Sequence, residues 1–123
     1  RRLGNDAQGV IITQVVPPPE PMDNGESLWG AAEYVQRLKT YFPTDPPNFV
    51  SFEGYVNAKV LVEGLRRAGP QVDRERFIDA IESIQDIDLG IANTLSFSPT
   101  DHQGLERVYF TVFENGRFVW LKD

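Results

Sequence analysis

Apolar residues change their spacing along the chain, and the first spacing predicts a strand. Residues 9–16 read Gly-Val-Ile-Ile-Thr-Gln-Val-Val, a nearly continuous apolar run rich in β-branched side chains. Branched side chains favour a pleated backbone, and a run without polar alternation predicts a strand that is buried on both faces. The prolines at 17–19 end this strand, because proline cannot donate to a sheet and fixes its own backbone.

The middle of the chain predicts three helices, over residues 27–41, 51–68 and 74–84. In the first, apolar residues at three-four spacing define one buried face. That face consists of Leu28, Ala31, Ala32, Val35, Leu38 and Phe42. Glu33 and Arg37 lie four residues apart on the other side, where an ion pair would stabilise the helix by roughly a few tenths of a kcal/mol.

The second predicted helix has an apolar arc so wide that we expect the helix to lie between other elements. The arc comprises Phe52, Tyr55, Val56, Val60, Leu61, Val62 and Leu65. Gly69-Pro70 closes this helix, and Asp73 is a good N-cap for the third one. The core stripe of the third helix consists of Phe77, Ile78, Ile81 and Ile84.

The end of the chain predicts a β-hairpin. A short strand is predicted before it, over 95–98, and residues 89–94 before that strand are expected to be irregular. Residues 108–113 and 117–121 flank Asn115-Gly116. Two-residue hairpin turns prefer this pair because both positions need a positive φ. The two faces are expected to carry Tyr109 and Phe113 on one side, and Phe110 with Phe118 and Trp120 on the other. Because both faces are aromatic, we expect other structure to cover both.

Length, composition and charge limit the classes of protein that this pattern allows. With 123 residues, 41% of them hydrophobic and 24% charged, the chain is long enough for one globular domain. Its net charge of −6 disfavours binding to nucleic acid and to anionic lipid. It contains no cysteine, which excludes disulfides and thiolate zinc sites. The chain opens Arg1-Arg2 without an initiator Met, and we therefore expect it to be a piece of a longer protein.

The residues offer little for catalysis, metal binding or cofactors. His102, the single histidine, follows Asp101 in a polar turn, but nothing places a nucleophile beside it. We interpret this pair as a turn in which polar side chains satisfy local backbone groups. One histidine without clustered carboxylates predicts no metal site. The prolines after residue 16 lack the N–H donors of a phosphate-binding loop, so we expect neither an enzyme nor a cofactor.

Glu53 stands between two aromatic residues at the start of the second predicted helix, in the sequence Phe52-Glu53-Gly54-Tyr55. A carboxylate with aromatic neighbours can hold the ammonium group of a ligand. An acidic residue near a helix N-terminus is also favoured by the helix dipole alone. Both interpretations stay open on the sequence.

Three segments, taken in this order, resemble the periplasmic leucine/isoleucine/valine-binding protein family. They are residues 9–17, residues 49–69 with the motif Phe52-Glu53-Gly54-Tyr55, and residues 97–104, Phe-Ser-Pro-Thr-Asp-His-Gln-Gly, which the Asn115-Gly116 hairpin follows. Members of the family are substrate-binding components of ABC importers of the branched-chain amino-acid type. The resemblance implies an α/β fold, here a partial type I periplasmic-binding-protein fold with three helices, one buried strand and a C-terminal β-hairpin. Family members are longer, so we expect this chain to correspond to their C-terminal third.

The resemblance also implies two lobes that are joined by crossovers and close on a small ligand. The expected segments are 1–16, the end of a second-lobe segment; 17–26, a crossover linker; 27–94, a helical first-lobe segment; and 95–123, strands and a hairpin that return across the lobes. The hinge would include Val15, Val16 and Pro17. Gln14, Phe52, Glu53 and Tyr55 are the expected ligand-binding residues, because these positions face the cleft in such proteins.

The implied ligand is a small amino-acid-like or hydrophobic carboxylate, the implied partner a membrane permease, and the implied location the periplasm or another extracytoplasmic space. Much of the family's pocket comes from segments that precede this one. We therefore expect the chain on its own to bind amino acids poorly, and to self-associate through exposed lobe contacts.

Two alternatives remain. The same fold serves as an extracellular ligand-sensing module of receptors and signalling proteins, which a signalling or transmembrane segment in the complete gene would reveal. The chain could also be a complete small α/β enzyme or interaction domain, which a start codon directly before Arg1 would favour.

Overall fold

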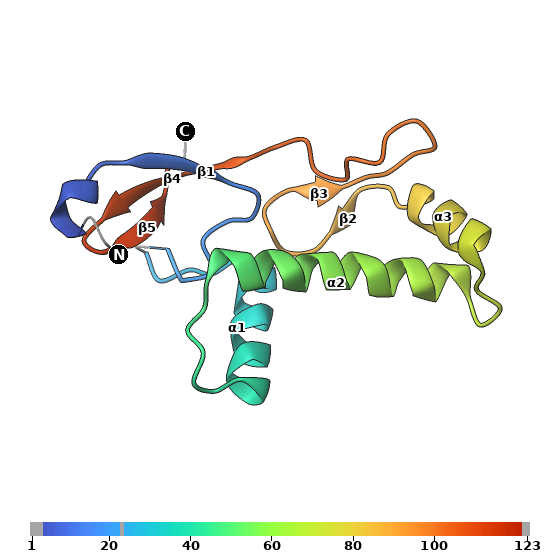
Figure 1. The fold of residues 1–123 in the computed structure, drawn as a ribbon, viewed down its shortest axis with the longest axis horizontal. Helices are drawn as coiled ribbons and strands as arrows, with labels where there is room; N and C mark the ends of the chain where they lie inside the picture. The colour runs from blue at the N-terminus through green and yellow to red at the C-terminus, as the bar shows by residue number, and fades with distance from the viewer. Residues whose placement is uncertain (1–3, 23, 122–123) are drawn as a thin grey trace.

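The computed structural model describes residues 4–22 and 24–121, and the elements form an elongated α/β arrangement (Figure 1). In chain order these are η1 (Gly4–Ala7), β1 (Ile11–Gln14), α1 (Trp29–Tyr41), α2 (Phe49–Ala68), α3 (Arg74–Glu82), β2 (Ile87–Asp88), β3 (Thr94–Leu95), β4 (Tyr109–Glu114) and β5 (Arg117–Trp120). One end of the molecule holds β1, β4 and β5, and the other holds α2, α3, β2 and β3. The three predicted helices and the C-terminal hairpin are therefore confirmed.

The first predicted strand is present but is less buried than its sequence indicated. β1 is an edge strand of a sheet with the order β1-β4-β5, and it pairs antiparallel with β4 alone. Its residues alternate between exposed and half-buried, and Ile11 is 56% exposed. The prediction of a strand buried on both faces is wrong for this structure, because no described element covers the second face.

The hairpin turn forms as predicted, with φ of 51° at Asn115 and 83° at Gly116. The predicted division of its aromatic residues is wrong. Phe118 pairs directly with Phe113, and Trp120 pairs with Thr111. Since directly paired residues of neighbouring strands share a face, both rings lie on the same face as Tyr109, and Phe110 lies alone on the other.

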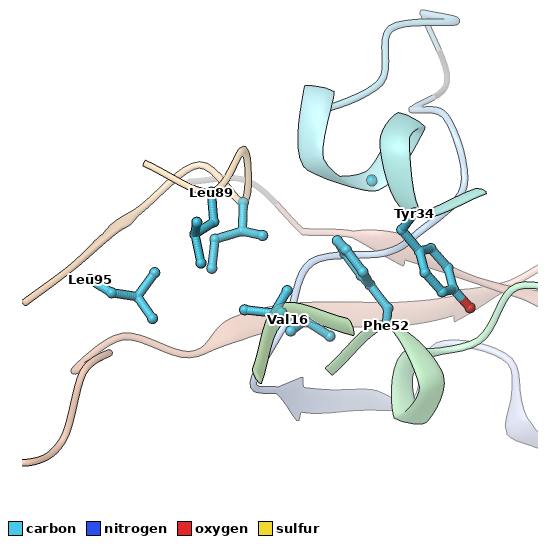
Figure 2. Packing of buried hydrophobic residues seen from close by; sticks show 8 residues of the cluster. Val16, Tyr34, Phe52, Leu89 and Leu95 are labelled. Atoms are coloured by element: carbon cyan, nitrogen blue, oxygen red, sulfur yellow. The ribbon is translucent and has the colours of Figure 1, made fainter. Parts of the chain in front are cut away.

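The hydrophobic core lies where α1 and α2 meet the loops around β2 and β3 (Figure 2). Tyr34 of α1 stacks on Phe52 of α2, with ring centroids 4.9 Å apart. Val16 reaches this cluster from the segment that follows β1, and Leu89 and Leu95 close it from the opposite side. The apolar residues of two helices and two loops thus form one core without a central sheet.

Two details of the predicted helix faces need correction. Ala32 and Phe42 of the predicted stripe are exposed, whereas Tyr34 is buried. The outer side of α2 is also uncovered, since Leu61 and Val62 are each about half exposed. α2 contacts both α1 and α3, as expected of a helix that lies between other elements, but this outer side has no cover among the described residues.

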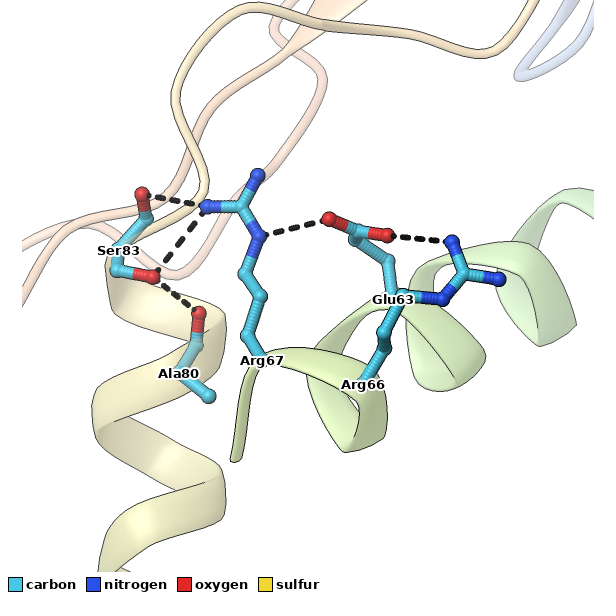
Figure 3. A network of polar contacts seen from close by, with 5 residues as sticks. All are labelled: Glu63, Arg66, Arg67, Ala80 and Ser83. Carbon is cyan, nitrogen blue, oxygen red and sulfur yellow. Dashed lines mark hydrogen bonds and ion pairs between the residues drawn. The ribbon is translucent and has the colours of Figure 1, made fainter. Parts of the chain in front are cut away.

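α2 and α3 are held together by a network of charged and polar groups (Figure 3). Arg67 Nε donates to Glu63 Oε1 over 2.8 Å, and Arg67 Nη1 donates to the carbonyl oxygen of Ser83 over 3.0 Å. Arg66 also pairs with Glu63, over 3.3 Å. The pKa of Glu63 is lowered, mainly by the hydrogen bond from Arg67. One arginine thus joins the end of α2 to the end of α3.

Candidate functional site

A notch opens beside α2, where residues of two connections line one cavity. One connection follows β1, and the other, residues 96–108, leads from β3 to β4. The notch has a volume of about 480 Å³. Its lining includes Val15, Val16, Glu53, Asn57, Val60, Phe97, His102, Glu106 and Arg107. It combines an apolar floor with exposed carboxylate, amide, imidazole and guanidinium groups at its rim.

One predicted ligand-binding residue, Glu53, and two predicted hinge residues, Val15 and Val16, line this notch. Glu53 lines it from the first turns of α2, and Val15 and Val16 line it from the segment after β1. Glu53 is exposed and Val16 is buried in the core. The two predicted groups, one for binding and one for the hinge, therefore share one surface.

The other predicted site residues lie elsewhere. Phe52 is fully buried in the core, and Pro17 is also buried. Gln14 is half-buried and pairs with Tyr109 within the sheet. Tyr55 is two positions after Glu53 on α2, and because residues two apart on a helix point in nearly opposite directions, it lines a different cavity. The role of each as a ligand-binding or hinge residue stays a prediction.

That second cavity, of about 490 Å³, lies between α1 and the beginning of α2. Tyr34 forms its floor, and its hydroxyl is 2.5 Å from Ser51 Oγ and accepts a hydrogen bond from Asn48 N over 3.2 Å. Asn48 is the N-cap of α2, where its Oδ1 accepts from Ser51 N over 2.9 Å. The hydroxyl of one buried tyrosine thus fixes the entrance of α2 against α1.

A charged cluster that the sequence did not predict joins the two helices. Lys59 Nζ lies 2.5 Å from Glu33 Oε2, 4.8 Å from the ring centroid of Trp29 and 5.7 Å from that of Tyr55. The expected partner of Glu33 was Arg37, and the structure gives Lys59 instead. Lys59 comes from 26 positions away, and helical spacing carries no information about such a partner.

The same cluster changes the ionisation of two side chains. The hydrogen bond from Lys59 lowers the pKa of Glu33, against a smaller opposing effect of burial. Burial, followed by the hydrogen bond to Glu33, raises the pKa of Tyr55 to about 12. Lys59 is therefore already neutralised by Glu33, and it is not a free cation for the carboxylate of a ligand.

His102 and Asp101 bond to different partners in the structure. His102 Nε2 is 2.8 Å from Glu82 Oε1 of α3, and Asp101 Oδ1 accepts a hydrogen bond from Gln103 N over 2.9 Å. Asp101 therefore satisfies a local backbone group, as the turn interpretation predicts. Within residues 4–22 and 24–121, no group of three or more His, Cys, Asp or Glu side chains could hold a metal ion. No helix in this part of the chain is both long and apolar enough to cross a membrane.

Residues 1–117 match the family described as "Periplasmic binding protein", and the chain belongs to that family. A search of curated proteins found no match. Among solved structures, 94% of the chain superposes on a "possible leucine/isoleucine/valine-binding protein" of Rhodopirellula baltica, with a TM-score of 0.83 and 28% identity. It is also similar to a branched-chain amino acid ABC transporter protein of Thermus thermophilus with bound valine, with a TM-score of 0.73 and 22% identity over 98% of the chain. A fatty acid ABC transporter substrate-binding protein of Thermomonospora curvata matches with a TM-score of 0.77 and 21% identity over 94% of the chain.

The chain spans about a third of these proteins. The matches cover 30% of the Rhodopirellula chain, 34% of the Thermus chain and 30% of the Thermomonospora chain. This confirms the predicted family, the α/β fold and the expectation that the residues correspond to only part of a family member.

Proposed function

We propose that this chain is part of the extracytoplasmic solute-binding protein of an ABC importer, and that it contributes one wall of the ligand cleft. Membership of the periplasmic binding protein family supports the class of function. The single observation that carries the assignment of the wall is the notch between Val15 and Glu53, which opens where two connections pass between the two ends of the molecule. The partner would be a membrane permease, and the process would be capture without chemical conversion.

The proposed ligand is a small amino-acid-like or hydrophobic carboxylate. Two similar structures are a branched-chain amino acid ABC transporter protein with bound valine and a fatty acid ABC transporter substrate-binding protein. Valine and fatty acids share a carboxylate attached to an apolar group. In this chain, Glu53 would accept hydrogen bonds from a ligand ammonium group, and Val15, Val16 and Val60 would contact its apolar part. A ligand that contacts both sides of the notch stabilises the closed state by its higher affinity for that state.

The test begins with the protein that the complete reading frame encodes, in a thermal-shift screen against amino acids and small carboxylates. Calorimetric titration of the best ligand then compares the wild type with Glu53→Gln. If an ammonium group lies against Glu53, this change weakens binding about tenfold or more, since a charge-assisted hydrogen bond contributes roughly 1.5–3 kcal/mol.

Glu75→Gln is the matched control, because Glu75 is an exposed carboxylate on α3 that does not line the notch. Equal affinity of the Glu53 and Glu75 variants for an amino acid would show that Glu53 does not bind the ligand. A complete protein that binds none of the tested amino acids or carboxylates would contradict the proposed ligand class.

A further inference from the structure

The chain contains two Asn-Gly pairs, Asn24-Gly25 and Asn115-Gly116. Asparagine deamidates most readily before glycine, because glycine has no Cβ to hinder the approach to its own backbone nitrogen. Both pairs are exposed, and the two glycines have nearly equal φ values of 80° and 83°. Exposure and backbone conformation of the glycine therefore do not distinguish the pairs, whereas their hydrogen bonds do.

Deamidation begins when the backbone nitrogen of the glycine attacks the side-chain carbon Cγ of the asparagine. This nitrogen loses its proton to hydroxide or a buffer base and bonds to Cγ, and the side-chain nitrogen takes up a proton and leaves as ammonia. Water then opens the succinimide ring at one of its carbonyl groups, which gives aspartate or isoaspartate. The reaction therefore needs a side-chain amide that can turn and a backbone N–H that is free to attack.

Both reacting groups of Asn24 are held in a compact turn. Its Nδ2 donates to Glu26 Oε2 over 2.8 Å, and its Oδ1 accepts from Glu26 N over 3.1 Å. The attacking group, Gly25 N, donates to the carbonyl oxygen of Met22 over 2.8 Å. The amide of Asn24 therefore turns toward Gly25 N only when these hydrogen bonds break.

Asn115 lies in the two-residue turn between β4 and β5 and lacks this protection. Within residues 4–22 and 24–121, neither its side-chain amide nor Gly116 N forms a hydrogen bond, and its backbone N donates to Gln8 Oε1 over 3.2 Å. The turn is closed by the pair of Glu114 with Arg117 at the tip of the hairpin. Exposed tips open locally at a low cost in free energy, and such an opening lets Gly116 N reach Cγ of Asn115.

We infer that Asn115 is a site of spontaneous modification, where the chain slowly acquires aspartate or isoaspartate, and that its turn protects Asn24. The aspartyl product keeps the backbone and adds a negative charge beside Glu114. The isoaspartyl product also lengthens the backbone of the turn by one atom. Because the turn fixes the register of a hairpin, this product disturbs the pairing of Glu114 with Arg117.

The test follows both asparagines in the protein of the complete reading frame during long incubation at mildly alkaline pH. Trypsin releases Asn115 in the peptide of residues 108–117 and Asn24 in that of residues 3–37, where fragment spectra separate it from Asn5. Mass spectrometry then gives the rate of deamidation at each position. We expect Asn115 to react at least about tenfold faster than Asn24, since each hydrogen bond that must break adds to the cost of opening the turn.

The same protein in concentrated guanidinium chloride is the matched control, because unfolding removes the hydrogen bonds of both turns and leaves both Asn-Gly pairs unchanged. The two rates should become nearly equal there. In the folded protein, Glu26→Ala removes the acceptor of Asn24 Nδ2, so it should speed the reaction at Asn24 and leave that at Asn115 unchanged.

Equal rates in the folded protein, or a faster reaction at Asn24, would overturn the inference. A difference that persists unchanged in guanidinium chloride would also overturn it, because the local sequence and not the folded structure would then set the rates. The measurement needs no ligand, so its outcome is independent of the proposed function.

Discussion

At the scale of single residues, the close contact between α2 and α3 depends on a glycine, because a larger side chain would not fit at that position. Gly64 of α2 faces α3 so closely that a Cβ atom there would lie 2.4 Å from Ile81 Cδ1 and 2.9 Å from Phe77 Cε2. Gly54, ten positions earlier on the same helix, has nothing within 4 Å of the corresponding point. A larger side chain therefore fits at position 54 of α2 but not at position 64.

Gly64→Val should lower the free energy of unfolding by roughly 1–3 kcal/mol, because the added methyl groups must displace Ile81 and Phe77. Gly54→Val is the matched control, and it should change stability by only about a few tenths of a kcal/mol, since valine is slightly better than glycine in a helix. Urea unfolding followed by circular dichroism measures both. Equal effects of the two substitutions would show that α2 and α3 do not pack as described.

The Glu33–Lys59 pair predicts a dependence of stability on pH. Lys59 lowers the pKa of Glu33 below 4.5 in the folded chain, so the pair stabilises the fold above that pH and its contribution is lost as the pH falls through the lowered value. Glu33→Gln should therefore cost about 0.5–1 kcal/mol at pH 7, a modest value because both side chains are partly exposed.

The difference in stability between wild type and Glu33→Gln should shrink when urea unfolding is repeated at successively lower pH below about 4.5. Glu106→Gln, which removes an exposed carboxylate, serves as the control and should leave stability almost unchanged at pH 7. A difference that stays constant from pH 7 to pH 3 would argue that Glu33 acts through packing and not through its charge.

At the scale of elements, the start of α3 follows local chemistry, whereas the buried face of α1 depends on a neighbouring helix. Asp73 caps α3 as predicted, with its Oδ1 accepting from Arg76 N over 2.8 Å. The buried face of α1, by contrast, includes Tyr34, which is absent from the predicted stripe, because Phe52 and Ser51 of α2 receive its ring and its hydroxyl. An N-cap needs only the next three residues, while a buried face needs a second helix.

Asp73→Ala should destabilise the chain by about 1 kcal/mol, the usual cost of removing an N-cap side chain. Asp79→Ala, an exposed change in the interior of the same helix, is the control and should be neutral or slightly stabilising, because alanine is a better helix former than aspartate. Both values come from urea unfolding. A neutral Asp73→Ala would mean that the start of α3 contributes little to the stability of the fold.

At the scale of the whole molecule, apolar side chains stay exposed on several elements, among them Ile11, Leu61, Val62 and Phe110. The elements that carry them, α2 on the one hand and β1 and β4 on the other, lie at different ends of the molecule. On the proposed function, this chain contributes one wall of a ligand cleft. Its ligand contacts should therefore be incomplete when it is studied alone.

The 123-residue chain alone should accordingly bind branched-chain amino acids only weakly, in the millimolar range or above, whereas the protein of the complete reading frame should bind its ligand tightly. Each missing hydrogen bond to a charged ligand group removes roughly 1.5–3 kcal/mol of affinity. Isothermal titration of both proteins under one condition makes the comparison. Tight one-to-one binding by the 123-residue chain would contradict the view that it forms only one wall.

The sequence by itself determined the features that depend on neighbouring residues. It predicted three helices, the N-cap at Asp73 and the positive φ values of Asn115 and Gly116, because propensity, capping and turn chemistry act over a few positions. The order of these elements was also enough for the family resemblance, which the match over residues 1–117 confirmed. The predicted binding residues were less well determined, since Glu53 and Tyr55 are only two positions apart in the sequence but line different cavities.

Only the tertiary structure decided which elements meet and which faces stay open. It paired Glu33 with Lys59 and left the second face of β1 without a cover among the described residues. The physical reason is that a run such as Ile11-Ile12-Thr13-Gln14 records the environment for which its side chains are suited, and it does not record which segment supplies that environment. That partner is set by contacts between positions far apart in the sequence, and hydrophobic spacing carries no information about them.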